Sequence, residues 1–309
     1  MDTKIVYIES DYKHNCNYNN DFIFYLRKVC SNLHIVHTVD KKYVEQINNI
    51  NPDSIIVGFG IMDSGNNKPR LNLTNVNCSN IYVILNKEYA GLTNKLNWVK
   101  NLKPTRVFSV HHDVDVYEKQ LQIPFTRIMW SAREDVFKKS SDTYKHDLFF
   151  SGVIRAEQTD NMRNKIYDKL DELKDYNCLI RAAFFKNNQL VGKLYTFNLN
   201  QYANQINNSK IALTTTGPAD LVGTRYFEIM ATNKALIMCN RMPDKVYEDI
   251  VIDGVTCVMF DDENEFIEKC KYYLTHEDER KKIVNQAYDH FLKTQMWKHK
   301  IEHFLKYIE

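Results

Sequence analysis

Several catalytic motifs are absent from this 309-residue chain. No G-x-G-x-x-G follows the first apolar run, no G-x-S-x-G occurs, and no P-loop lysine motif is present. These absences argue against a dinucleotide site at the first strand, an α/β-hydrolase nucleophile and a P-loop nucleotide site. We therefore do not expect the first half of the chain to hold a nucleotide cofactor.

Paired cysteines, long apolar runs and blocks of one charge are also missing. The seven cysteines form no C-x-x-C pair and several lie in apolar runs, which is typical of reduced thiols in an intracellular protein. No run reaches the length of a membrane span, and the N-terminus carries a short strand in place of a signal-peptide core. Because the formal net charge is only +2, no nucleic-acid partner is expected. We expect a cytoplasmic protein, with peripheral membrane contact left open.

What the chain does contain is a regular alternation of apolar runs and amphipathic stretches. In the first half, strands are predicted at 4–9, 34–39, 54–59, 81–86, 106–111 and 125–130. In the second half, they are predicted at 147–152, 178–183, 210–214, 235–239 and 256–260. Helical patterns between them predict parallel sheets with right-handed crossovers. The length is sufficient for two α/β domains.

The most informative stretch is 214–240, TTTGPADLVGTRYFEIMATNKALIMCN, which follows the order strand, loop, helix, strand. This order places a helix N-terminus at the carboxyl edge of a parallel sheet, where free N–H groups and the helix dipole favour an anion such as a diphosphate. Arg225 adds a fixed charge with forked donors, and Glu228 follows one turn later as an acceptor for a sugar diol. An ordinary βαβ unit of the core, with Arg225 and Glu228 as a surface ion pair, explains the same sequence equally.

Residues 225–231, RYFEIMA, followed by ALI at 235–237, resemble the R-x-F-E-x-x-A signature of GT-B glycosyltransferases. The resemblance is to the group-1 type with a CgeB-like or spore-protein-like C-terminal domain. Asp220 and Glu228 resemble the E-x7-E motif of related retaining enzymes, with Asp in the first place. Residues 147–152 resemble the strand that opens the donor-binding half. The resemblance implies an α/β protein of two Rossmann-like domains facing across a cleft, with C-terminal helices packing back on the first domain.

The same resemblance implies a domain plan and a donor site. Residues 1–140 would form the acceptor-side domain, 141–285 the nucleotide-sugar-binding domain, and 286–309 a helix crossing back to the first domain. Glu228 would bind the nucleotide ribose, and backbone N–H groups around 222–224 would cradle phosphate. The predicted donor-binding residues are Gly152, Arg155, Asp220, Gly223, Thr224, Arg225 and Glu228. Gly152 lets backbone approach a ligand closely, although an ordinary tight turn explains it equally well.

The implied activity is transfer of a sugar from a nucleotide-sugar to a hydroxyl of a glycan, protein or lipid-linked acceptor. No cofactor and no divalent metal are expected. Glu88 and His111 follow strands of the first half, at the sheet edge where ligands bind, and are candidates for the general base. A surface glutamate and a strand-end histidine are the alternative interpretation. The sequence leaves inverting and retaining chemistry both open.

Three other functions stay open. Asp113 and Asp115 form a D-x-D, which in metal-dependent GT-A glycosyltransferases holds a divalent ion, although so short a pattern often occurs by chance. His111 and His112 have no Cys or His partner at ligand spacing, so a zinc site is not expected. The remaining two are a sugar-nucleotide epimerase on the same fold and a non-catalytic GT-B-like binding module.

Overall fold

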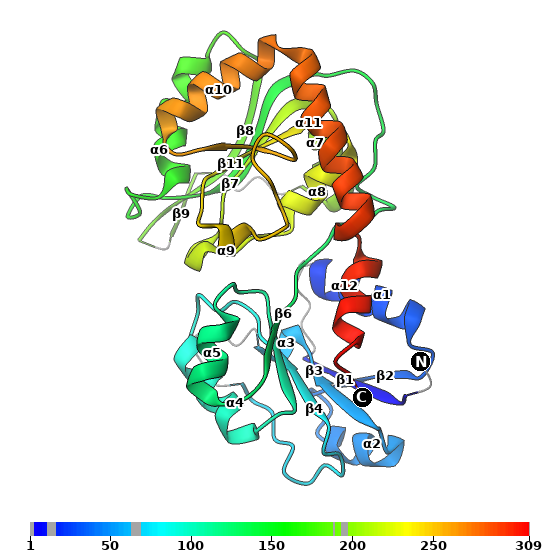
Figure 1. Cartoon of the computed structure of the whole chain (residues 1–309). Coiled ribbons are helices and arrows are strands. Elements are labelled where there is room, and N and C mark those ends of the chain that lie inside the picture. The colour runs from blue at the N-terminus through cyan, green and yellow to red at the C-terminus, as the bar shows by residue number, and fades with distance from the viewer. Residues whose placement is uncertain (1–2, 11–16, 63–68, 188, 193–196, 309) are drawn as a thin grey trace. The chain divides into compact units, whose positions relative to one another are not determined.

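The computed structural model describes residues 3–10, 17–62, 69–187, 189–192 and 197–308. The chain forms two compact units, each with its own sheet (Figure 1). The first unit comprises Met1–Trp130 and Trp297–Glu309, and the second comprises Ser131–Met296. In the part of the chain that the structure describes, no helix combines the length and the apolar character needed to cross a membrane.

The first unit is built on a six-stranded parallel sheet with the order β2-β1-β3-β4-β5-β6. Its strands are β1 (Ile5–Glu9), β2 (Leu33–His37), β3 (Ser54–Val57), β4 (Ile81–Ile84), β5 (Arg106–Ser109) and β6 (Phe125–Arg127). Its helices are α1 (Asn17–Val29), α2 (Tyr43–Ile50), α3 (Phe59–Met62), α4 (Leu92–Leu102), α5 (Val114–Leu121) and α12 (Trp297–Leu305). Strands β1 and β3 are buried along their whole length, as expected for parallel strands covered on both faces.

Helix α12 closes the first unit by packing beside α1 (Figure 1). Trp297, at the start of α12, is fully buried. Its indole stacks on Tyr25 with ring centroids 5.9 Å apart and meets Phe22 edge-on at 6.1 Å. Phe304 adds a contact to Phe22 at 5.2 Å. The last turns of the chain therefore complete the core of the first unit.

Replacing Trp297 by alanine should destabilise the first unit by about 3–5 kcal/mol, because it removes a fully buried indole from an aromatic cluster. Urea unfolding followed by circular dichroism measures the change. Val39→Ala is the matched control, since Val39 is 63% exposed and its truncation should cost less than about 0.5 kcal/mol. Equal costs for the two variants would contradict the packing role of α12.

The second unit is built on a six-stranded sheet with the order β12-β11-β10-β7-β8-β9, parallel except for β9. Its strands are β7 (His146–Arg155), β8 (Cys178–Lys186), β9 (Gln189–Val191), β10 (Ser209–Thr214), β11 (Leu236–Asn240) and β12 (Val258–Phe260). Its helices are α6 (Met162–Lys169), α7 (Leu199–Asn207), α8 (Arg225–Thr232), α9 (Asp244–Tyr247), α10 (Glu263–Thr275) and α11 (Glu277–His290). A π-helical segment, Phe291–Gln295, follows α11.

The two sheets, parallel apart from β9, confirm the predicted α/β fold with two Rossmann-like units. The sequence missed the antiparallel strand β9, which pairs with the end of β8. Helix α6 ends at Lys169, and a 3-10 turn, Leu170–Leu173, follows.

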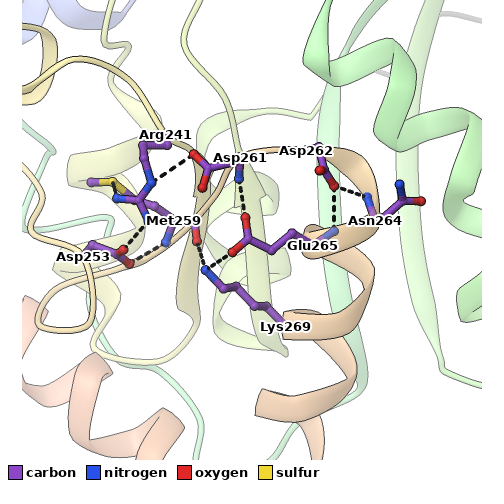
Figure 2. Close-up of polar contacts among 8 residues, drawn as sticks. All are labelled: Arg241, Asp253, Met259, Asp261, Asp262, Asn264, Glu265 and Lys269. Carbon is purple, nitrogen blue, oxygen red and sulfur yellow. Dashed lines mark hydrogen bonds and ion pairs between the residues drawn. The ribbon is translucent and has the colours of Figure 1, made fainter.

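An ionic network fixes the carboxyl ends of β11 and β12 (Figure 2). Arg241, directly after β11, binds Asp253 at 2.6 Å and Asp261 at 3.0 Å. Asp262 caps α10 by accepting the backbone N–H groups of Asn264 and Glu265 at 2.8 and 2.9 Å. The carboxylates of Asp261 and Asp262, which directly follow β12, are therefore already paired within the second unit.

Candidate active site

The strand order of the second sheet marks where a ligand is expected. The chain runs outward from β7 through β8 to β9, and then returns to the other side of β7 as β10. In open α/β sheets, ligands bind at the carboxyl ends of the strands at such a switch point. A ligand is therefore expected between the end of β7 and the loop after β10.

Arg163 lies at this switch point. It reaches from the start of α6 and donates from Nε and Nη2 to Thr215 Oγ1, at 3.1 and 2.8 Å. Its Nη1 donates to the backbone oxygen of Val153 at 3.3 Å. A Cβ atom at Gly152 would lie 3.1 Å from Arg163 Cδ, so the glycine leaves room for this side chain. The guanidinium is held firmly at the carboxyl edge.

Arg225 brings a second positive charge to the same place. Burial, and next the charge of Arg225, lower the pKa of Arg163 to about 10. Arg163 is still protonated at neutral pH, so two cations repel each other at this edge. A bound anion would relieve that repulsion. Tyr202 of α7 hydrogen-bonds Arg225 and so orients it.

Two hydrogen bonds fix the conformation of the loop before α8. The Thr216 backbone N–H donates to Asn240 Oδ1 at 3.0 Å, and that of Gly217 donates to Leu221 O at 2.7 Å. Gly223 is exposed, and nothing lies within 4 Å of where its Cβ would be. The first N–H groups of a helix lack intrahelical acceptors, so the N-terminus of α8 offers donors to a ligand.

Glu228 lies one turn into α8 and is partly buried. Burial raises the pKa of its carboxyl group to about 7, against the opposing effects of a hydrogen bond from Thr224 and the charge of Arg225. Thr224 also precedes the helix directly, and its backbone oxygen accepts the Glu228 N–H at 3.0 Å. Thr224, Arg225 and Glu228 thus form one cluster at the helix start.

Arg155 and Asp220 lie outside the contacts that define this cluster. Arg155 ends β7 with its guanidinium 5.2 Å from the ring centroid of Phe185, and its backbone oxygen accepts from Asn164 Nδ2 at 2.5 Å. Asp220 is exposed in the 3-10 turn Pro218–Asp220, at φ 54°. Their donor-binding roles stay predictions.

In the first unit, the structure brings Glu88 and His111 to the carboxyl ends of β4 and β5, where both are buried. The Ser109 hydroxyl joins them, since it donates to Glu88 Oε1 at 2.6 Å and accepts the His111 backbone N–H at 3.0 Å. The other oxygen, Oε2, is buried without a hydrogen-bond partner among the described residues. His111 Nδ1 accepts the Asp113 N–H at 3.1 Å, so the neutral ring carries its proton on Nε2.

The buried residue Lys95 positions Glu88. Its ammonium donates to the backbone oxygens of Asn86 and Lys87 at 2.7 and 3.0 Å. Lys87 has a left-handed backbone, with φ of 51°. The bound ammonium holds this turn, which delivers Glu88 to Ser109.

Lys95→Met should lower the free energy of unfolding by roughly 2–4 kcal/mol, because two buried carbonyl groups lose a charged donor. Chemical denaturation measures this loss. Lys100→Met is the matched control on the same helix, and it should be nearly neutral because Lys100 is exposed. A neutral Lys95→Met would show that the loop does not depend on the ammonium.

The D-x-D residues lie at the start of α5. Asp113 precedes α5, while Asp115 is exposed in its first turn. Asp113 instead joins His111 and His112, whose ligand atoms all lie within 4.8 Å of one another. The two imidazoles stack with centroids 4.2 Å apart, and the N···O distances to Asp113 are 3.8 and 3.7 Å.

Known protein families and solved structures resemble this chain. Residues 162–306 match the family described as "Glycosyl transferase-like", a range that includes Arg163, Arg225 and Glu228. The chain resembles the structure of HepE from Anabaena, solved with UDP and glucose, at 9% identity, 98% coverage of each chain and a TM-score of 0.64. None of the curated proteins matches the sequence. The second half of the chain therefore matches a glycosyltransferase family, and the whole chain has the GT-B fold.

Two further solved structures share this fold. One is a glycosyltransferase from Rickettsia africae, with 12% identity, coverage of 99% of this chain and 97% of that chain, and a TM-score of 0.63. The other is an alpha-glucosyltransferase in complex with UDP-glucose and DNA containing an abasic site, with 8% identity, full coverage of both chains and a TM-score of 0.66. At such identities the likeness shows the fold alone. The CgeB-like subtype stays a prediction.

Sequence reasoning missed two polar residues at these sheet edges. Arg163 lies in α6, and only its contacts with Thr215 and Val153 place it at the switch point of the second sheet. Glu9 ends β1, where burial raises the pKa of its carboxyl group despite hydrogen bonds from Asn19 and Ser10. Strands β2 and β3 flank β1, so Glu9 lies at the switch point of the first sheet. The position of Glu9 at the end of the first predicted strand could have marked it as a candidate from the sequence.

Proposed function

We propose that the second unit binds the donor nucleotide-sugar at the carboxyl edge of its sheet. The observation that carries the proposal is the convergence of Arg163 and Arg225 beside the N-terminus of α8, with Glu228 one turn away. The two guanidinium groups and the helix N–H donors suit a diphosphate. The ionised Glu228 carboxylate suits the hydroxyl pair of a ribose. Gly152, Arg155, Asp220, Gly223 and Thr224 complete the proposed donor site.

Uridine diphosphate sugars are the donors to test first. UDP or UDP-glucose is bound in two of the structures that share this fold, the HepE protein of Anabaena and the alpha-glucosyltransferase. A pyrophosphate leaving group gains negative charge as the glycosidic bond breaks. Fixed cations placed at that oxygen stabilise the transition state more than the ground state. Arg163 and Arg225 therefore take the role that a metal ion has in other transferases, and no cofactor is required.

The first unit, in this proposal, binds the hydroxyl acceptor, which is a glycan, a protein or a lipid-linked sugar. Glu88 is the candidate for the general base, since its buried Oε2 has no hydrogen-bond partner in the described chain. As a proton sits on Nε2 of neutral His111, we assign this side chain a donor role toward the acceptor. A cytoplasmic location fits the cysteines, since all six in the described residues are free thiols.

The test is product analysis with UDP-glucose and a panel of sugar and glycan acceptors, run with EDTA and with Mg²⁺. The proposal predicts UDP release and an elongated acceptor at similar rates in both. Conversion of UDP-glucose to another UDP-sugar without an acceptor would identify an epimerase instead. Activity abolished by EDTA and restored by Mg²⁺ would overturn the metal-independent mechanism.

A further inference from the structure

The amino edge of the second sheet carries a cluster of cations centred on Tyr144. Tyr144 lies just before β7, and Lys234 lies between α8 and β11. Arg280 comes from the first half of α11, which packs against α8 and β11 (Figure 1). The cluster is at the opposite end of the sheet from Arg225, separated from it by the length of α8, about 12 Å for eight residues.

Arg280 is almost completely buried, with 1% of its surface exposed. Its Nε and Nη2 have no hydrogen-bond partner among the residues that the structure describes. Nη1 has only a long contact to the backbone oxygen of Tyr273 at 3.5 Å. The Glu277 carboxylate is 3.9 Å from Nη2, beyond hydrogen-bond length. A buried guanidinium with unpaired donors is costly unless an acceptor reaches it.

Lys234 is the second cation and is only 3% exposed. Its Nζ lies 3.8 Å from the ring centroid of Tyr144, and Arg280 Cζ lies 5.2 Å from the same centroid. Burial and next the charge of Lys139 lower the pKa of Lys234 against the opposing charge of Asp142, and Lys281 and Arg280 add smaller lowering effects. Cation–π contact and the carbonyl end of α8 offset part of this repulsion.

The carboxylates near the pair are already bound to other lysines. These ion pairs are Asp142 with Lys139 at 2.6 Å, Asp147 with Lys210 at 2.7 Å, and Glu277 with Lys281 at 2.6 Å. Each acid is thus matched by its own lysine. Arg280 and Lys234 remain as an excess of two positive charges around one aromatic ring.

We propose that Arg280 and Lys234 form a second anion-binding site, which takes the phosphate group of a small phosphorylated molecule. The guanidinium fork matches two phosphate oxygens, and the lysine adds a point charge from the side of Tyr144. A phosphate monoester carries nearly two negative charges at neutral pH, which matches the excess of two cations. A free anion is favoured over a membrane headgroup because both cations are buried too deeply to meet a bilayer.

The experiment uses the full chain with Arg163→Met and Arg225→Met, which removes phosphate binding at the donor site. Inorganic phosphate is titrated at constant ionic strength against chloride, and binding is followed by calorimetry and by the melting temperature. We expect phosphate to raise the melting temperature in this background. Adding Lys234→Met should weaken phosphate binding at least about tenfold. Lys169→Met is the matched control, since Lys169 is exposed and paired with Glu172, and it should change nothing.

The melting temperature in chloride distinguishes a variant that has lost phosphate binding from one that has lost stability. The proposal predicts that Lys234→Met is as stable as its background in chloride or more so, because a repelling charge has been removed. A variant that is less stable in chloride, or that responds to phosphate unchanged, would make the cluster a structural cation–π contact and overturn the proposal. Vesicles containing phosphatidic acid should not sediment the protein in a Lys234-dependent manner, and such sedimentation would overturn the choice of a free anion.

Discussion

Replacing Arg163 by methionine is expected to lower kcat/KM for the donor by about a hundredfold or more. The guanidinium is held by Thr215 and Val153 at the switch point, so its charge is fixed before the donor binds. A fixed charge needs no reorganisation as negative charge builds on the leaving diphosphate. Methionine keeps much of the side-chain volume but supplies neither the charge nor the donors. Steady-state kinetics with varied UDP-sugar measure the effect.

Arg133→Met is the matched control for this variant. Arg133 lies in the same unit, is partly exposed and forms an ion pair with Asp135 at 2.5 Å. Its loss should change kcat/KM less than about threefold, in line with the small energies of surface ion pairs. Equal effects of Arg163→Met and Arg133→Met, with both proteins folded, would remove Arg163 from the donor site.

Replacing Glu228 by glutamine is expected to raise stability above pH 7 while weakening nucleotide binding. Burial raises the pKa of this carboxyl group from 4.5 to about 7 in the folded protein. Between these values the folded state holds the extra proton, so stability falls as pH rises through this window. The full difference is roughly 3 kcal/mol. Glutamine stays neutral, so the variant should match wild type near pH 5 and exceed it near pH 8.

Nucleotide binding should show the opposite dependence. The ionised carboxylate accepts stronger, charge-assisted hydrogen bonds from a ribose than the protonated group does, so the affinity of wild type for UDP should fall below pH 7. Glu228→Gln should bind UDP about ten- to a hundredfold more weakly near pH 8. Urea unfolding and UDP calorimetry at both pH values test the pair of statements. A variant with unchanged UDP affinity, or with lower stability at pH 8, would contradict this role of Glu228.

Much of the fold was predictable because parallel strands that are buried on both faces appear in the sequence as continuous apolar runs. Strands β3 and β10 begin at or next to the predicted positions, and the helix expected within 214–240 is α8, Arg225–Thr232. The short strand β9 was not predictable, since its three residues are all exposed and have no buried face. Its position depends on pairing with the end of β8, a tertiary contact that the local sequence does not show.

The candidate site was predictable where one helix carries its residues and unpredictable where separate elements meet. Arg225 and Glu228 share a turn of α8, so their spacing alone placed them together. Arg163 is 62 residues before Arg225 in the chain, and only the strand order between β7 and β10 brings it to Thr215. Lone basic residues in helices are common, so no local signal distinguished Arg163 from its neighbours.

The most direct test of the account is a thermal-shift panel of UDP, GDP, CDP and ADP on wild type and Glu228→Ala, with and without Mg²⁺. A nucleotide present at about 100 times its Kd stabilises the folded protein by roughly 2.7 kcal/mol. The account predicts a shift for one nucleotide, independent of Mg²⁺, that is strongly reduced in Glu228→Ala. No shift with any nucleotide, or an equal shift in the variant, would contradict a donor site at the N-terminus of α8.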